Sequence, residues 1–205
     1  MWKLYEAAEE KYRPAILLGA FAGLRTAEAC GLRLADVDLD AMAVTPTVQY
    51  PAEPLKTESS VAAVPIPHTF AGELKRLLDG RTSGWVLVDD DGSAQLGPWK
   101  VERGTYCRIR KQVPGLSPDF RFHDLRHYYA SMLIASGADV KVVQQRLRHS
   151  KATTTLNTYS HLWPDADQST RTAVERAMGP LIEKHCGPCA DCRRVRTGSV
   201  QLRAC

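Results

Sequence analysis

The chain has 205 residues, of which 44% are hydrophobic and 24% are charged, so its composition suits one globular domain and argues against intrinsic disorder. No apolar run reaches the ~18 residues that a membrane span needs, and the acidic, amphipathic first residues do not form a secretory signal. These features exclude membrane-spanning and secreted classes, and they predict a soluble, cytoplasmic protein.

The net charge of +4 conceals an uneven distribution of charge along the chain. Residues 1–99 carry 9 Lys and Arg against 14 Asp and Glu, whereas residues 100–151 carry 11 against 4. A basic centre in an otherwise acidic chain favours a surface that binds a polyanion, although a solvated basic face has the same composition.

In chain order, the sequence begins with two predicted helices. Residues 2–9 form a short amphipathic segment, and residues 13–22 are apolar enough for a buried helix. Pro14 suits the first turn of the second helix, and Gly23 is expected to end it.

A short helix and a small sheet are expected next. Thr26 is predicted to cap a helix that runs to Cys30, which places Arg25 on the turn between two helices. Residues 34–66 contain short β-type runs separated by Pro, Asp and Glu, typical of an antiparallel sheet of two or three strands. Lys56 falls in the connection before the last strand.

The rest of the sequence predicts further helices with loops between them, and the segment after Pro98 is basic. From Cys186 onward the chain lacks apolar periodicity and is interpreted as a tail. The expected helices cover residues 68–79, 98–112, 122–136, 139–147, 151–160 and 168–178.

His123 and Arg126 are the first candidates for chemistry. They stand three residues apart, which places both side chains on one face of a helix. A hydrogen-bond donor beside a permanently charged guanidinium fork suits a phosphodiester. On its own, however, an H-x-x-R pair more often belongs to a surface helix whose side chains face water.

Three sequence boxes give that pair a context, and the third box contains it. They are FAGLRTAEACGLRLADVDLD at 21–40, LKTESSVAAVPIP at 55–67, and HDLRHYYAS, SGADVKVVQQRLRHS and TTTLNTYSHL between 123 and 162. In this order they resemble the first box, the β-hairpin and the second box of the tyrosine recombinase (phage integrase) family. The resemblance runs from about residue 3 to residue 163. Three boxes in this order over that length are not explained by chance.

The resemblance implies six catalytic residues. Two arginines and two histidines would bind the scissile phosphate, the lysine would protonate the leaving 5′-oxygen, and the tyrosine would be the nucleophile. No metal, ATP or other cofactor is expected, because the arginines and the lysine supply the charge that a metal would bring. The six residues are Arg25, Lys56, His123, Arg126, His149 and Tyr159.

Several neighbouring residues need a separate interpretation. Glu28 is expected to orient Arg25 or to cap a turn. Arg148 stands where the family has the glycine of L-G-H-S, so it is strained if the turn needs positive φ, and otherwise adds a phosphate contact. Tyr128 and Tyr129 are expected to pack in the core, and His127 has no assigned chemistry.

The predicted fold class is α+β and mostly helical: a tyrosine recombinase catalytic-domain fold with a small three-stranded antiparallel sheet. The catalytic domain is expected over residues 1–165, without the N-terminal core-binding domain of other family members. Residues 166–184 are expected to form a C-terminal helix that docks on a neighbouring protomer. Residues 185–205 are expected to be a disordered Cys- and Arg-rich tail, and a metal site there is the less favoured reading because a fourth ligand at regular spacing is missing.

The predicted function is site-specific recombination or integration of double-stranded DNA, by a homotetramer arranged as a pair of dimers on the nucleoid. Whether it serves a phage, a conjugative or other mobile element, or the chromosome stays open. Two alternatives also stay open: a catalytically silent DNA-binding remnant of an integrase, and a type IB topoisomerase-like enzyme. The filled catalytic positions favour activity, whereas the missing domain and Arg148 favour the remnant.

Overall fold

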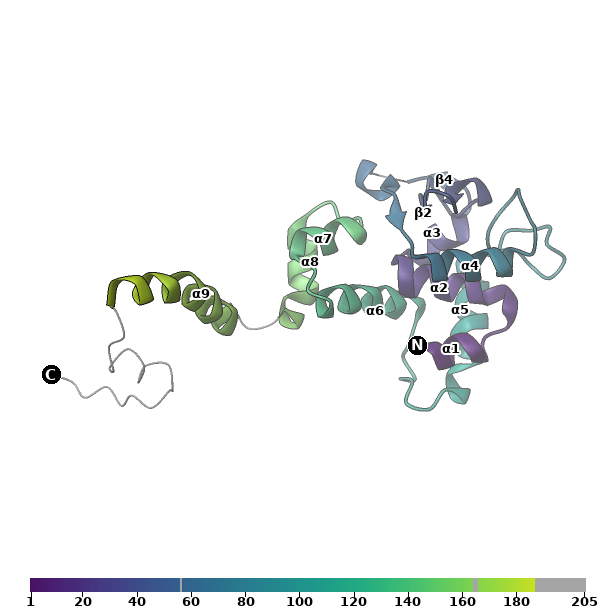
Figure 1. Ribbon diagram of the computed structural model, residues 1–205. Helices are drawn as coiled ribbons and strands as arrows, with labels where there is room; N and C mark the ends of the chain where they lie inside the picture. The colour runs from purple at the N-terminus through teal and green to yellow at the C-terminus, as the bar shows by residue number, and fades with distance from the viewer. Residues whose placement is uncertain (56, 164–165, 187–205) are drawn as a thin grey trace. The chain divides into compact units, whose positions relative to one another are not determined.

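The computed structural model describes residues 1–55, 57–163 and 166–186. The chain divides into two compact units, Met1–Trp163 and Pro164–Cys205. The described part of the first unit is mostly helical and contains two small antiparallel sheets, so the predicted α+β class is confirmed (Figure 1).

Two packed helices, α2 (Arg13–Ala22) and α6 (Phe122–Ala135), form the centre of the first unit. Gly19 of α2 faces α6, and a Cβ built at Gly19 would lie 2.8 Å from Cδ1 of Leu125. That separation is shorter than real carbon contacts, so glycine is what lets the two helices approach. The predicted N-terminal helix is α1 (Trp2–Ala7), which packs on α2.

The turn after α2 is the first element that builds the site. Gly23 ends α2 in the left-handed conformation, with φ 62°, as predicted. The next helix, α3 (Thr26–Gly31), begins three residues later, and its N-cap residue is Arg25. The predicted Thr26 cap is therefore wrong, because the Glu28 carboxylate rather than a threonine hydroxyl binds the first free amide. Arg25 does lie on the turn between two helices, as expected.

The predicted three-stranded antiparallel sheet is present, in the order β1-β2-β5, and a two-stranded sheet of β3 and β4 accompanies it. The second sheet was not predicted. Lys56 follows β4 and lies outside the described residues. The strands are β1 (Val37–Asp38), β2 (Ala43–Val44), β3 (Val48–Gln49), β4 (Glu53–Pro54) and β5 (Val64–Pro65).

The predicted basic helix over residues 98–112 is interrupted. Helix α5 (Pro98–Glu102) passes into a π-helical turn, Arg103–Cys107, and a 3-10 turn follows at Arg110–Gln112. Within the π-helical turn, a side chain at Gly104 would overlap the ring of Tyr12. We attribute the break to this close contact and to the low helix propensity of glycine. The preceding helix, α4 (His68–Leu78), forms as predicted.

Helices α7 (Val140–Arg146) and α8 (Ala152–Tyr159) complete the first unit beside α6 (Figure 1). Asp139 is the N-cap of α7, and its carboxylate accepts a hydrogen bond from the Val142 amide at 2.8 Å. A second apolar cluster joins α6, α7 and α8, and so fixes the end of α8 against α6. Its buried members are Tyr129, Ala130, Ile134, Val143, Leu147 and Tyr159.

In the second unit, α9 (Ala166–Cys186) is longer than the predicted helix over 168–178 and contains Pro180. Among the described residues, no helix is long and apolar enough to cross a membrane. Nor do the described residues contain a group of three His, Cys, Asp or Glu placed to hold a metal ion. The predicted tail lies outside the described residues from residue 187 onward.

Candidate active site

Arg25 and Glu28 close the turn that begins α3. Glu28 Oε2 accepts a hydrogen bond from the Arg25 backbone amide at 2.8 Å, and Oε1 accepts one from Arg25 Nη1 at 2.6 Å. The Glu28 side chain is 2% exposed, whereas that of Arg25 is 41% exposed. Glu28 therefore both caps the helix and orients the Arg25 guanidinium.

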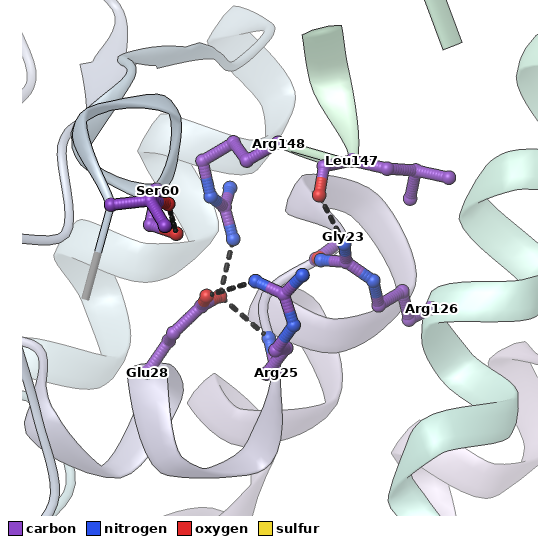
Figure 2. A network of polar contacts seen from close by, with 8 residues as sticks. Gly23, Arg25, Glu28, Ser60, Arg126, Leu147 and Arg148 are labelled. Atoms are coloured by element: carbon purple, nitrogen blue, oxygen red, sulfur yellow. Dashed lines mark hydrogen bonds and ion pairs between the residues drawn. The ribbon is translucent and has the colours of Figure 1, made fainter. Parts of the chain in front are cut away.

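Arg148 brings a second guanidinium to the same carboxylate (Figure 2). Its Nη2 donates to Glu28 Oε2, across 120 residues of sequence. The backbone of Arg148 has φ 54°, so this turn does have the positive φ that favours glycine. The side chain is fully buried, and its Nε and Nη1 have no hydrogen-bond partner.

Arg126 lies on α6, is only 1% exposed, and joins the two turns that carry the other arginines. Its Nη1 donates to the Gly23 carbonyl before Arg25, and its Nη2 donates to the Leu147 carbonyl before Arg148 (Figure 2). Burial lowers the pKa of Arg126 below the usual arginine value, and the charge of Arg25 lowers it further.

Two of these arginines, Arg25 and Arg148, contact the Glu28 carboxylate, and Arg126 acts on it through its charge. Burial alone would raise the pKa of Glu28, but the charges of Arg148, Arg25 and Arg126 outweigh it and hold that pKa below its usual value. Glu28 is therefore ionised at neutral pH, and one negative charge faces three guanidinium groups. A cluster with this excess of positive charge and spare donors suits an anion such as a phosphate.

A second group of side chains surrounds Tyr159 at the end of α8. The Tyr159 hydroxyl lies 2.8 Å from Nδ1 of His127, whose ring packs edge-on against His123 at 4.6 Å between centroids. Burial raises the pKa of Tyr159, and the charge of Arg126 opposes that rise only in part. The phenol is therefore protonated at neutral pH, with an imidazole nitrogen in hydrogen-bond contact.

His149 follows Arg148 directly and lies beside the arginines. Its Nδ1 is 2.9 Å from the Thr155 hydroxyl. Burial lowers the pKa of His149 from 6.5 to about 4, with further contributions from the charges of Arg126 and Arg25. The imidazole is therefore neutral at pH 7 and is held in one orientation by Thr155.

The structure brings together the predicted site residues that it describes, and their pKa shifts report mutual electrostatic effects. Lys56, the sixth predicted residue, lies outside the described residues. The five are Arg25, His123, Arg126, His149 and Tyr159.

Sequence reasoning missed the contact made by His127. A signal was present, because His127 is four residues after His123 and so shares its helix face. The expected burial of Tyr128 is wrong: it is 39% exposed on α6, whereas Tyr129 is buried as predicted. Thr155 was also missed, since nothing in its local sequence distinguishes it from the neighbouring threonines.

Residues 1–165 match the phage integrase family. This match covers well over half of the 205-residue chain. The chain belongs to the phage integrase family.

Two curated relatives illustrate the likeness in sequence. A tyrosine recombinase of Thermosipho africanus is 30% identical over 83% of this chain and 56% of its own length. Tyrosine recombinase XerA of Thermococcus kodakarensis is 30% identical over 84% of this chain and 56% of its own length. The chain thus spans about half the length of these relatives.

Solved structures share the fold. The Tn1549 transposon integrase, in complex with circular intermediate DNA, superposes with a TM-score of 0.66 at 23% identity, covering 82% of this chain and 60% of that one. The XerA recombinase superposes with a TM-score of 0.63 at 21% identity, covering 86% and 60%. At these identities the likeness establishes the tyrosine recombinase catalytic-domain fold.

Proposed function

We propose that residues 1–165 are the catalytic domain of a site-specific DNA recombinase that cuts and rejoins strands through a 3′-phosphotyrosyl intermediate on Tyr159. One observation carries the proposal: the Tyr159 hydroxyl contacts His127 Nδ1 at 2.8 Å, beside a cluster in which three arginines face one carboxylate. Membership of the phage integrase family, and curated relatives named tyrosine recombinases, support it.

The cationic groups would hold the scissile phosphate. Arg25 and Arg126 would bind its non-bridging oxygens and stabilise the charge that grows in the pentacoordinate transition state. When the Thr155 hydroxyl donates to Nδ1 of His149, the proton of the neutral ring is on Nε2, which can donate to the phosphate. His123, exposed in the first turn of α6, would add a second imidazole donor.

The nucleophile needs a proton acceptor, because burial raises the pKa of Tyr159. His127 Nδ1 would accept the phenolic proton as Oη forms its bond to phosphorus. The bond from phosphorus to the 5′-oxygen breaks, and that oxygen takes a proton from Lys56, the residue that matches the family's hairpin lysine. One phosphodiester is exchanged for another, so no metal ion or ATP is consumed.

Double-stranded DNA is the proposed partner, bound along the basic stretch of residues 100–151. We propose a pair of dimers on DNA in the cytoplasm, at the nucleoid. In that assembly α9 would dock on a neighbouring protomer, consistent with its exposed apolar residues Val174 and Met178. Light scattering of the protein with and without a DNA duplex would measure the number of protomers.

Trapping the covalent intermediate tests the function. The chain is incubated with a pool of nicked random-sequence duplexes at low salt with EDTA, and a denaturing gel is examined for a protein–DNA band. We expect a band that disappears with Tyr159→Phe and persists with Tyr128→Phe, a matched change at an exposed tyrosine of the neighbouring helix.

The same experiment separates the alternatives. A salt-sensitive gel shift without a covalent band would favour a DNA-binding remnant. A covalent band with relaxation of supercoiled DNA, but without strand exchange, would favour a topoisomerase-like enzyme.

A further inference from the structure

We propose that Arg148 is a third arginine of the phosphate site, whose Nε and Nη1 bind a non-bridging oxygen of the scissile phosphate. The inference rests on the proposed function, because it names a further ligand of the same phosphodiester. Arg148 stands where the L-G-H-S box that this segment resembles has a glycine, which provides no side chain.

The first argument is that the hydrogen bonding of Arg148 is incomplete. Only Nη2 has a partner, Glu28, while Nε and Nη1 are buried without one. Buried donors of a charged group without acceptors are rare, and they point to a ligand that provides the acceptor.

The second argument is the balance of charge around Arg148. Burial is the main cause that lowers the pKa values of Arg148 and Arg126. The charge of Arg25 lowers both further, and that of Arg148 also lowers the pKa of Arg126, so the three guanidinium groups lie within electrostatic reach of one another. Glu28 supplies one negative charge to this cluster. An oxyanion is the class of ligand that both neutralises the excess charge and accepts several hydrogen bonds.

The third argument is that arginine is held here against the preference of the backbone. At φ 54° a glycine would be unstrained, yet the arginine side chain is fully buried and directed at Glu28. Packing therefore fixes the guanidinium in place before any ligand arrives, which is the condition for a preorganised anion ligand.

The competing explanation is that Arg148 only ties its own turn to α3 through Glu28. Such a tie uses Nη2 alone, and it would affect anion binding only through Glu28 and Arg25. A direct ligand would matter whether or not the carboxylate is present. The two explanations therefore differ in a Glu28→Gln background.

Inorganic phosphate is the probe that isolates the site from DNA sequence. Its dissociation constant is obtained from the rise in melting temperature as phosphate replaces chloride at constant ionic strength. Arg148→Gly suits the backbone at φ 54°, and Arg148→Lys preserves a charge for Glu28 without the planar fork. Arg146→Ala, two residues earlier, is the matched control.

We expect Arg148→Gly to weaken phosphate binding about tenfold, Arg148→Lys to weaken it severalfold, and Arg146→Ala to leave it unchanged. The tenfold effect should recur in the Glu28→Gln background. Three results would each overturn the inference. Arg148→Gly could bind phosphate as tightly as the unsubstituted chain, its effect could be present only when Glu28 is present, or phosphate could fail to stabilise the unsubstituted chain.

A second readout uses DNA itself. Each lost phosphate contact should reduce the slope of log binding constant against log salt by about 0.9, so Arg148→Gly should bind the duplex pool with a correspondingly shallower slope. An unchanged slope would refute the contact. If the covalent band depends on Tyr159 but phosphate binding does not depend on Arg148, the proposed function is supported and this inference is refuted. If phosphate binding depends on Arg148 but no covalent band forms, this inference is supported and the proposed function is refuted.

Discussion

Replacing Glu28 by alanine should destabilise the first unit strongly, because this carboxylate holds two guanidinium groups and a helix start. It accepts hydrogen bonds from the Arg25 amide at 2.8 Å, from Arg25 Nη1 at 2.6 Å and from Arg148 Nη2. The last of these decides the magnitude, since the fully buried Arg148 side chain cannot turn to water.

The expected loss can be assembled from these contacts. Removing one partner of a buried ion pair costs about 3–5 kcal/mol, because the other charge is left buried and unpaired. Loss of the helix cap adds about 1 kcal/mol. The pair with Arg25 adds less than about 1 kcal/mol, because that guanidinium is 41% exposed and screened by solvent. A total of roughly 4–7 kcal/mol is comparable to the whole stability of a small domain.

Urea unfolding followed by circular dichroism measures the loss. Glu10→Ala is the matched control, because it breaks a 2.7 Å pair with Arg76 in which both side chains are at least half exposed, and less than about 1 kcal/mol is expected. In the Glu28→Ala, Arg148→Gly double variant the stranded charge is gone. The two substitutions should therefore be coupled by at least about 2 kcal/mol.

A loss below about 1.5 kcal/mol in Glu28→Ala would refute this reasoning. So would strict additivity in the double variant, because it would mean that the buried pair does not hold the two turns together.

Three further predictions follow from single residues. Burial, and then the charges of three arginines, lower the pKa of His149 from 6.5 to about 4. Its stabilising contribution is therefore complete above pH 6.5 and lost as pH falls towards 4. The full shift corresponds to about 3 kcal/mol, which partial exposure of the ring reduces to about 1–2 kcal/mol, and His149→Gln should flatten the urea midpoints between those pH values. Gly23→Ala should lower the free energy of unfolding by about 2–4 kcal/mol, because φ is 62° and the new Cβ would lie 2.5 Å from a tyrosine ring. The control Gly115→Ala, with φ 81° but open space around the new Cβ, should lower it by only about 1–2 kcal/mol. Equal losses in the two variants would contradict this reasoning. His127→Asn keeps a hydrogen-bond acceptor near the position of Nδ1 but cannot take a proton. Formation of the covalent complex should therefore slow about 100-fold at neutral pH and recover as pH rises, whereas the control His161→Asn should have no effect. A rate in His127→Asn equal to that of the unsubstituted chain would exclude His127 as the base.

Much of the fold follows from local signals in the sequence. The helix from residue 13 to 22 has a proline in its first turn and a glycine at its end, and both act within a few residues. The three-stranded sheet follows from short β-type runs separated by proline and acidic residues. Such signals need no knowledge of distant segments, which is why the predicted bounds agree with the structure.

The failures have different physical origins. The basic helix after Pro98 is interrupted where Gly104 packs against Tyr12, a contact between distant segments that no local pattern reports. The cap of α3 is instead a local contact, in which Glu28 binds the Arg25 amide three residues before it, and Glu28 also binds the distant Arg148. The sequence left the φ of Arg148 open; the structure shows that it is positive and that Glu28 is the partner that holds the arginine there.

That partner explains how the site acts as one unit. Arg148 stands on the same turn as His149, and its bond to Glu28 joins this turn to the one that presents Arg25. Arg126 connects the same two turns through the Gly23 and Leu147 carbonyls. Two arginines thus bridge the segments that carry the predicted phosphate ligands. Because the charge of Arg126 also acts on Tyr159, the bond between Arg148 and Glu28 is the bridge whose change should alter the phosphate site while leaving the nucleophile in place.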